Sequence, residues 1–154
     1  MADAATVVMK ATILPDEIAK TITDTTTVTP KDANDKWYYK LTEVQNASSD
    51  LIAGYFVDYT AVASNTSPTA VSTSDKIEFL FVQNIDTAND IYMVFNAGTA
   101  SNTAGSAIKV GPGESWYGRI PNATVADVHA IGYDPVGAAA IAVNAVVAAL
   151  IDDV

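Results

Sequence analysis

The sequence predicts an all-β protein: a single β-sandwich of the jelly-roll type with an extended N-terminal arm. Short runs of β-branched and aromatic residues recur along the chain, and turn residues separate them at intervals of about eight to twelve residues. The densest such region is residues 76–120, KIEFLFVQNIDTANDIYMVFNAGTASNTAGSAIKVGPGESWYGRI. The number of strands and one long loop favour a jelly roll over an immunoglobulin-like sandwich, whose Cys–Trp–Cys pattern requires cysteines that this chain lacks.

The composition limits the classes of function. The chain has 154 residues, enough for one domain with a hydrophobic core, and 49% of them are hydrophobic, which excludes a disordered chain. It carries 18 acidic and 8 basic residues, for a formal net charge of −10, and Arg119 is its single arginine. Because phosphate and base recognition depends on clustered Lys and Arg, we expect no direct binding to nucleic acid and none to anionic membranes.

The lack of cysteine excludes a disulfide framework, a thiolate zinc site and a cysteine nucleophile. The first twenty residues do not have the pattern of a signal peptide, because the charged start is missing and Lys10 interrupts the apolar run. The longest apolar stretch, residues 136–151, contains Asn144 and is too short to span a membrane. We therefore expect no membrane association.

Residues 1–30 differ from the rest of the chain. Residues 6–14 are apolar enough for a strand, and residues 18–29, IAKTITDTTTVT, are nearly all β-formers but carry few large apolar side chains. Such a strand does not fill a core, so we expect an edge segment or an arm that lies on another subunit; a frayed terminus is the alternative. The predicted division is an arm over residues 1–30 and a sandwich over residues 31–154.

Strands are predicted throughout the sandwich, with turns between them. The turns at 85–90 and at Gly111-Pro112-Gly113 are expected to close hairpins, and the polar loop 64–74 is expected to cross between sheets. The last segment, 138–151, suits a helix by its alanine content and a strand by its alternation, and its context favours a strand. The other predicted strands are residues 37–44, 55–63, 75–84, 91–96, 107–110, 114–120 and 125–133.

None of the candidate reactive groups predicts an enzyme. His129 is the only histidine, with Asp127 two residues before it, but no Gly-x-Ser-x-Gly elbow accompanies them. A single strand histidine is more often a half-buried polar residue or an interface contact. The sequence Asp86-Thr87-Ala88 resembles half of an aspartic protease site but lacks its glycine and its second aspartate.

The segment around Asp86 also gathers oxygen ligands, from Asn84, Asp86, Asn89 and Asp90. Calcium needs six to eight oxygens, and this spacing is not that of an EF-hand. Turn formation explains these residues without a metal, and the question of a bound cation stays open. The glycines of residues 105–113 lack the Gly-Lys-Ser/Thr of a phosphate loop. We expect no cofactor.

Aromatic residues occur in two clusters, Trp37–Tyr38–Tyr39 and Trp116–Tyr117. Neighbours along a strand point to opposite faces, so at least one ring of each cluster should point away from the core. Such rings anchor protein interfaces or stack on sugars, and cover by neighbouring loops is the alternative.

Two segments then resemble a known kind of protein: IEFLFVQNIDTANDIYMVFNAG and AIKVGPGESWYGRI resemble small β-sandwich structural proteins of tailed bacteriophages. The most similar group is the capsid decoration, or cement, proteins, and the resemblance covers about residues 75–150. It implies a jelly-roll subunit, often a homotrimer, on the outer capsid surface of the virion. Such a subunit would bind neighbouring copies of the major capsid protein and stabilise the shell.

The sequence also supplies candidate contacts for such a role. Residues 6–14 and 18–29 would form the contact arm, and Arg119 would pair with a carboxylate across an interface. The alternatives are another virion component, such as a tail-tube, neck or fibre-base subunit, or a carbohydrate-binding module. The candidate interface residues are Val7, Met9, Ile13, Ile18, Ile22, Trp37, Tyr39, Trp116, Tyr117 and Arg119.

Overall fold

The structure is a computed structural model that describes residues 4–13, 20–57, 69–120 and 122–154. Its contacts divide the chain into two compact units, Met1–Ala33 and Asn34–Val154. Strands form nearly all the regular structure, and the helical part of the described residues is one short 3-10 turn, η2 (Val125–Asp127). The prediction of an all-β protein is confirmed. No helix among the described residues is long and apolar enough to cross a membrane.

The first unit is a two-stranded antiparallel ribbon. Strand β1 (Ala5–Ile13) pairs with β2 (Lys20–Val28), and the register runs from Ala5 opposite Val28 to Ile13 opposite Lys20. The strand predicted over residues 6–14 is therefore present, and the Thr-rich segment after it is its partner. Neither strand pairs with a strand of the second unit.

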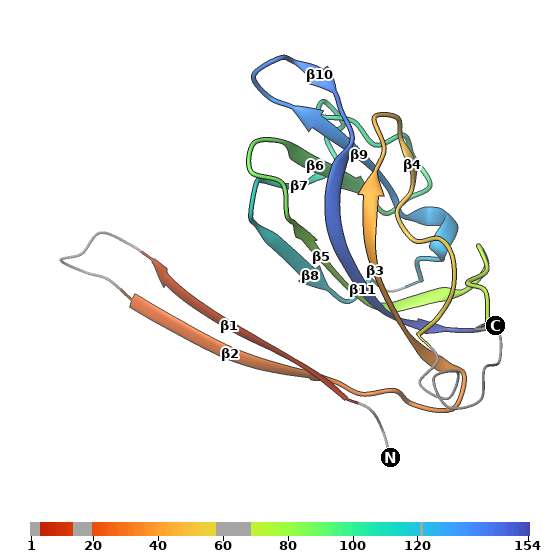
Figure 1. Ribbon diagram of the computed structural model, residues 1–154. Coiled ribbons are helices and arrows are strands. Elements are labelled where there is room, and N and C mark those ends of the chain that lie inside the picture. Colours follow the sequence, from red (N-terminus) through yellow and green to blue (C-terminus); the bar gives the residue numbers. More distant parts are fainter. Residues whose placement is uncertain (1–3, 14–19, 58–68, 121) are drawn as a thin grey trace. The chain divides into compact units, whose positions relative to one another are not determined.

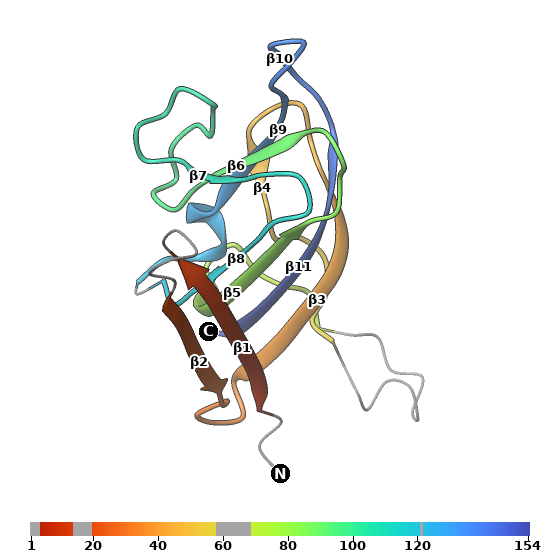
Figure 2. The same cartoon turned by 90° about the vertical axis from the view of Figure 1, so that its left-hand side faces the viewer.

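The second unit is a sandwich of two antiparallel sheets (Figure 1, Figure 2). One sheet has the order β3-β11-β5-β8; the other has the order β10-β9-β6-β7, with β4 also paired to β9. The bounds are β3 (Asp35–Val44), β4 (Ser49–Asp50), β5 (Lys76–Asn84), β6 (Asp90–Val94), β7 (Ile108–Val110), β8 (Ser115–Gly118), β9 (His129–Asp134), β10 (Ala139–Ala140) and β11 (Val143–Asp152).

The core lies between the two sheets. Alternate residues of β11 from Val143 to Ile151 point inward and are fully buried, which shows that segment 138–151 is a strand over most of its length and not a helix. Buried side chains of the other sheet, including Ile91 and Met93, belong to the same cluster. Small alanine and valine side chains on this central strand leave room for larger neighbours such as Leu80.

Both predicted hairpins are wrong. β5 and β6 lie in different sheets, and so do β7 and β8, so the turns after Asn84 and after Val110 carry the chain across the sandwich. β11 pairs with one edge of β5 and β8 with the other, which leaves no edge for β6. A turn sequence specifies a reversal of the chain, but it does not specify whether the next strand joins the same sheet.

Other boundaries also differ from the predictions. Residues 125–127 form η2 because Thr124 and Asp127 make a capping box, so the strand there begins only at His129. Between the strands predicted over residues 37–44 and 55–63, the structure has an additional strand, β4, which pairs with β9. Of the predicted strand 55–63, Tyr55 forms a single bridge with Ala70, and residues 58–63 lie outside the described residues, as do residues 64–68 of the loop 64–74.

Candidate interaction surface

The β3-β11-β5-β8 sheet has a second apolar face, on the side away from the core. The register sets Tyr39 beside Ala148, Ala148 beside Phe81, and Phe81 beside Tyr117. A parallel row sets Trp37 beside Leu150, and Leu150 beside Phe79. We call this surface the outer aromatic face; its members are Trp37, Tyr39, Leu41, Phe79, Phe81, Tyr117, Val146, Ala148 and Leu150.

A bulge in β5 shapes this face. The pairing with β11 shifts between Leu150 and Ile151, so Glu78 is an extra residue in β5. Ile77 therefore turns inward with Leu80, whereas simple alternation predicts Ile77 on the same face as Phe79. The bulge thus gives the core one more aliphatic side chain and leaves the outward side of β5 to phenylalanines.

The outer aromatic face is partly exposed and partly packed. Tyr39 and Leu41 are 62% and 61% exposed. Phe79 and Leu150 are buried, although neither belongs to the core cluster between the sheets. The rings of Phe79 and Tyr117 pack at a centroid separation of 6.3 Å. Contiguous large apolar side chains outside the core mark a surface suited to another protein.

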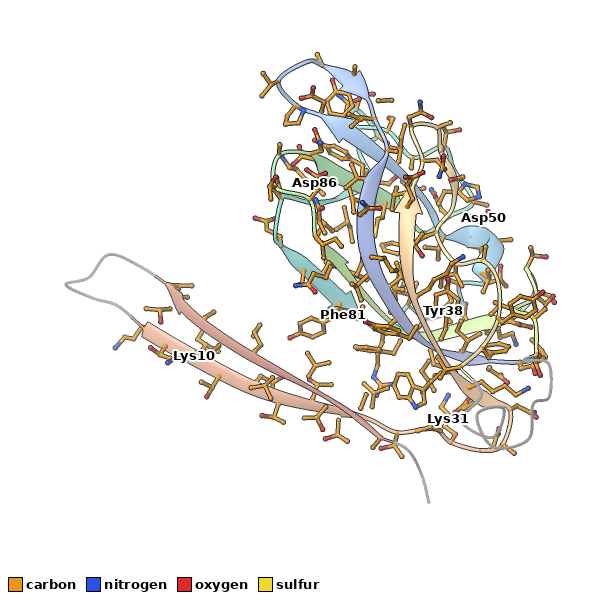
Figure 3. The ribbon with its side chains drawn as sticks, in the orientation of Figure 1. Lys10, Lys31, Tyr38, Asp50, Phe81 and Asp86 are labelled. Carbon is orange, nitrogen blue, oxygen red and sulfur yellow. The ribbon has the colours of Figure 1, made fainter. Side chains whose placement is uncertain are left out.

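Tyr38 and Trp116 point the other way. Tyr38 is buried, and its hydroxyl donates a hydrogen bond to the carbonyl of Ala53 (3.1 Å). Burial raises the pKa of the Tyr38 phenol, which keeps it a neutral donor. Trp116 stacks on Phe95 at 5.2 Å and packs against the core, so it does not share the outer face with Tyr117. Tyr38 and Phe81, both labelled in Figure 3, differ in this way: Tyr38 belongs to the core cluster between the sheets and Phe81 does not.

The pairing of β1 with β2 also separates two chemical surfaces. Val7, Met9, Ile13 and Ile22 share one side of the ribbon with Ala5, Ala11 and Val28, together with the polar residues Lys20, Asp24 and Thr26. We call this side the ribbon apolar face. The opposite side consists of Val8, Lys10 and the threonines 6, 12, 21, 23, 25 and 27.

The candidate contact residues therefore fall into groups. Val7, Met9, Ile13 and Ile22 lie on the ribbon apolar face; Trp37, Tyr39 and Tyr117 lie on the outer aromatic face. Arg119 is exposed just after β8, and Ile18 lies outside the described residues. Sequence reasoning did not place Leu41, Phe79, Phe81 and Leu150 on the side of the sheet away from the core cluster, where Leu41 is exposed and Phe79 and Leu150 are buried. A run of alternating apolar residues does not reveal which side meets the core.

Both ring nitrogens of His129 have polar partners in neighbouring segments. Its Nδ1 lies 2.8 Å from the carbonyl oxygen of Gly98, and its Nε2 lies 3.1 Å from Oδ1 of Asp50. Asp127 instead accepts hydrogen bonds from the backbone NH and the hydroxyl of Thr124, and these lower its pKa. His129 thus joins β9 to β4 and to the loop after β6, and Asp127 caps η2.

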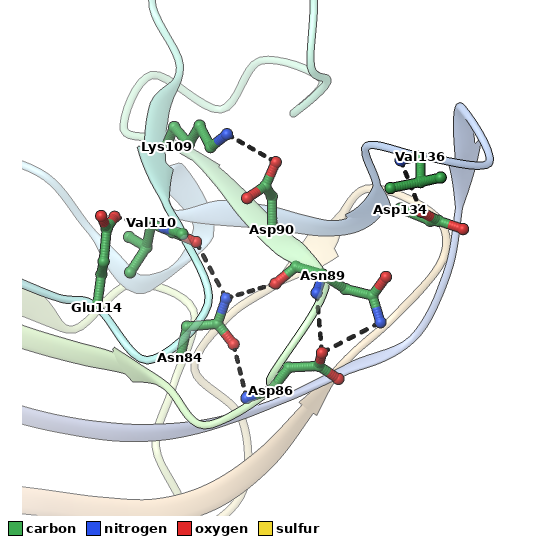
Figure 4. Close-up of polar contacts among 10 residues, drawn as sticks. Asn84, Asp86, Asn89, Asp90, Lys109, Val110, Glu114, Asp134 and Val136 are labelled. Atoms are coloured by element: carbon green, nitrogen blue, oxygen red, sulfur yellow. Dashed lines mark hydrogen bonds and ion pairs between the residues drawn. The ribbon is translucent and has the colours of Figure 1, made fainter.

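The oxygen-rich turn is held by its own hydrogen bonds (Figure 4). Oδ1 of Asp86 accepts hydrogen bonds from the backbone NH groups of Ala88 and Asn89, both at 2.8 Å, and these lower the pKa of Asp86. Asp90 meets Nζ of Lys109 at 2.8 Å, and this hydrogen bond raises the pKa of Lys109. Among the described residues, no group of three His, Cys, Asp or Glu side chains is arranged to hold a metal ion.

Asn84 forms hydrogen bonds with both segments that cross between the sheets, β5–β6 and β7–β8. It is fully buried, and its Nδ2 donates hydrogen bonds to the carbonyls of Asn89 (2.7 Å) and Val110 (3.1 Å). Its Oδ1 accepts from the NH of Asp86 (2.9 Å), and its own NH donates to the carbonyl of Glu114 (2.9 Å). One amide therefore bridges the β5–β6 crossing and the β7–β8 crossing.

Comparisons with known proteins give no relative for this chain. No protein-family model matches its sequence, and neither a curated protein nor a solved structure matches it. The features that a function has to explain are therefore those of the chain itself: a ribbon with one apolar face, a sandwich with an outer aromatic face, and turns held by their own hydrogen bonds.

Proposed function

We propose that this protein is a non-enzymatic structural subunit of a bacteriophage virion, a decoration protein that binds the major capsid protein on the outside of the head. The observation that carries the proposal is the number of large apolar side chains that the chain exposes outside its core. Most of them lie at three places: the ribbon apolar face, the outer aromatic face, and the end of the sandwich where β5 crosses to β6; Val8, Tyr55 and Val154 lie elsewhere.

We further assign the sandwich to the jelly-roll type. Leaving out the two-residue β10, the nine strands β3 to β11 become eight, and numbering them one to eight gives sheet orders of 1-8-3-6 and 2-7-4-5. The pairs 1 with 8, 2 with 7, 3 with 6 and 4 with 5 are those of one long hairpin folded over on itself. Two four-stranded sheets of interleaved Greek keys form a jelly roll, which is a common architecture of viral capsid domains.

The end of the sandwich is the surface that we assign to the shell. Val136, in the turn after β9, is 94% exposed, and Ile85 and Ile141 are also exposed. Ile85 donates a backbone hydrogen bond to the carbonyl of Asn144, near the start of β11, which brings the β5–β6 crossing close to the segment that contains Ile141. Asp86 and Asp134 lie in the same turns, so an apolar patch with an acidic border would meet a basic shell surface.

The mechanism would be avidity. The affinity of a single contact between one subunit and the shell would be modest. An oligomer that contacts several capsid subunits at once gains affinity, because the second contact is effectively intramolecular. A subunit that bridges its neighbours in this way opposes their separation. The overall charge of −10 favours approach to basic surfaces and keeps the unbound protein soluble.

The first test is whether the protein co-purifies with intact virions in a fixed ratio to the major capsid protein. The second is rebinding of purified protein to heads that lack it: Val136→Lys should weaken rebinding on the order of 10-fold or more, because the charge would be desolvated in the contact. Thr23→Lys, an exposed substitution on the threonine side of the ribbon, tests whether any added charge has this effect and should leave rebinding unchanged. Recovery in tail fractions, in a ring stoichiometry, would instead favour a tail-tube, neck or fibre-base subunit.

A further inference from the structure

We infer that the protein self-associates by ribbon exchange: the ribbon apolar face of one copy packs on the outer aromatic face of a second copy. This inference goes beyond attachment to a shell and needs no shell to be tested. It joins two surfaces outside the core cluster, and each of them exposes large apolar side chains: Met9, Ile13 and Ile22 on the ribbon, and Tyr39 and Leu41 on the sheet.

The ribbon requires a partner. An isolated two-stranded hairpin is at best marginally stable in water, because it has no second layer against which to bury its apolar side. Here Met9, Ile13 and Ile22 remain exposed on that side. The threonine side is different, because its hydroxyls are well solvated in water; Thr12 and Thr21 also lie within hydrogen-bond distance of each other.

The outer aromatic face has the dimensions to accept this ribbon. Both have strands of nine or ten residues, about 30 Å at 3.3 Å per residue, and sheets stack about 10 Å apart when apolar faces meet. Both faces also become polar at one end: Lys20 ends the ribbon apolar face, and Glu43 ends the sheet face beside Asn144. Placing Lys20 over Glu43 aligns opposite charges; Asp24 and Thr26, which are hydrogen-bonded to each other on the same side of the ribbon, would then lie within the contact.

The area explains why the exchange should be reciprocal. A ribbon about 30 Å long and two strands wide covers roughly 300 Å², so one ribbon–sheet contact removes roughly 600 Å² from water, counting both partners. Stable interfaces bury about 1,200–2,000 Å². Two contacts per pair of copies reach the lower end of that range, whereas one contact does not.

The connection between the units permits exchange. Among the described residues, β1 and β2 pair with each other and with no strand of the second unit. Residues 29–34 link β2 to β3 and span at most about 20 Å when extended. Pro30 restricts Thr29 to extended conformations. An element joined by such a hinge is readily swapped between identical chains.

The test compares matched lysine substitutions by analytical ultracentrifugation over a range of concentrations. Ile22→Lys on the ribbon and Leu41→Lys on the sheet should each weaken self-association on the order of 30-fold or more, because a charge would enter the apolar contact. Thr23→Lys, on the threonine side of the ribbon, and Val136→Lys, at the end of the sandwich, should leave it unchanged. All four side chains are exposed, and circular dichroism checks that each variant keeps its fold.

Mixing distinguishes exchange from other dimers. The Ile22→Lys variant keeps a normal sheet and the Leu41→Lys variant a normal ribbon, so their mixture retains one of the two contacts. It should associate more tightly than either variant alone but more weakly than the unmodified protein, because one contact falls below the area of a stable interface. The inference is overturned if the unmodified protein is monomeric at all concentrations, if Ile22→Lys has no more effect than Thr23→Lys, or if mixing restores nothing. Because Val136→Lys is expected to affect shell binding alone, failure here and failure of the proposed function give different results.

Discussion

The ribbon and the sandwich are made of the same kind of strand, but they satisfy their apolar side chains differently. In the sandwich, each sheet buries one face against the other, and strands distant in sequence, such as β3 and β11, are neighbours. In the ribbon, two consecutive strands pair with each other and have no second layer of their own. The comparison shows that strand pairing alone does not complete a β structure: an apolar face also needs a surface to cover it.

Substitution of one core residue should give the largest effect. Leu80 is fully buried in the sandwich core, so Leu80→Ala should lower the free energy of unfolding by about 3 kcal/mol through lost burial and the remaining cavity. Ile22→Ala, in the ribbon, should change it by less than about 0.5 kcal/mol when measured at a concentration where the protein is monomeric. Urea unfolding gives both values. Equal losses would mean that the ribbon is as well covered as the core.

An intermediate effect is expected at the sheet crossings, which the ribbon does not have. Asn84→Ala removes an amide that serves both crossings and leaves buried carbonyls without a donor, so unfolding should become easier by about 2–3 kcal/mol. Asn144→Ala, on the exposed side of β11, is the matched control and should lie within about 0.5 kcal/mol of the unmodified protein. If both variants were equally stable, the crossings would be held by the strands alone.

The smallest effect concerns acid stability. Backbone NH groups lower the pKa of Asp86 and of Asp127 in the folded state, so each carboxylate stabilises the fold above its unfolded pKa of about 3.9. That contribution is lost as the pH falls through the lower folded pKa. Asp86→Asn lacks this titration, so its urea midpoint should fall less between pH 5 and pH 2 than that of the unmodified protein. An identical fall would show that these turn hydrogen bonds do not contribute to acid unfolding. The interval from about pH 5 to about pH 2 is chosen because an aspartate with a lowered pKa titrates within it.

Most strands of the sandwich were predictable, and their partners were not. Residues 76–84 read as a central strand because both of their faces are apolar, and β5 does pair on both edges. The residues after Asn84 predict a hairpin, but asparagine and aspartate favour hairpin turns and sheet-crossing turns alike. The strand pairing shows that the chain changes sheet there, and the buried side chain of Asn84 binds both crossings. The predicted strand 125–133 is wrong at its start. There the capping box of Thr124 and Asp127 forms η2, and the alternation of apolar residues does not reveal such a contact.

The candidate interaction surface also has features that the sequence predicts and features that it does not. The expectation that neighbouring aromatics point to opposite faces is correct for Tyr38 and Tyr39 and for Trp116 and Tyr117, because alternation is a property of every strand. The amphipathic character of the ribbon was not visible, because residues 18–29 alternate poorly when read alone. It arises only when Ile22 pairs with Ala11 and Val28 with Ala5.

The sequence by itself determined that this protein is a β-sandwich without cysteine chemistry, since strand propensity, turn residues and composition are local properties of the chain. The tertiary structure decided which strands share a sheet, that Phe79, Phe81 and Leu150 lie outside the core, and that the ribbon has one apolar side. Those features depend on pairing between distant residues and on register, where a shift of one residue moves every side chain to the opposite face.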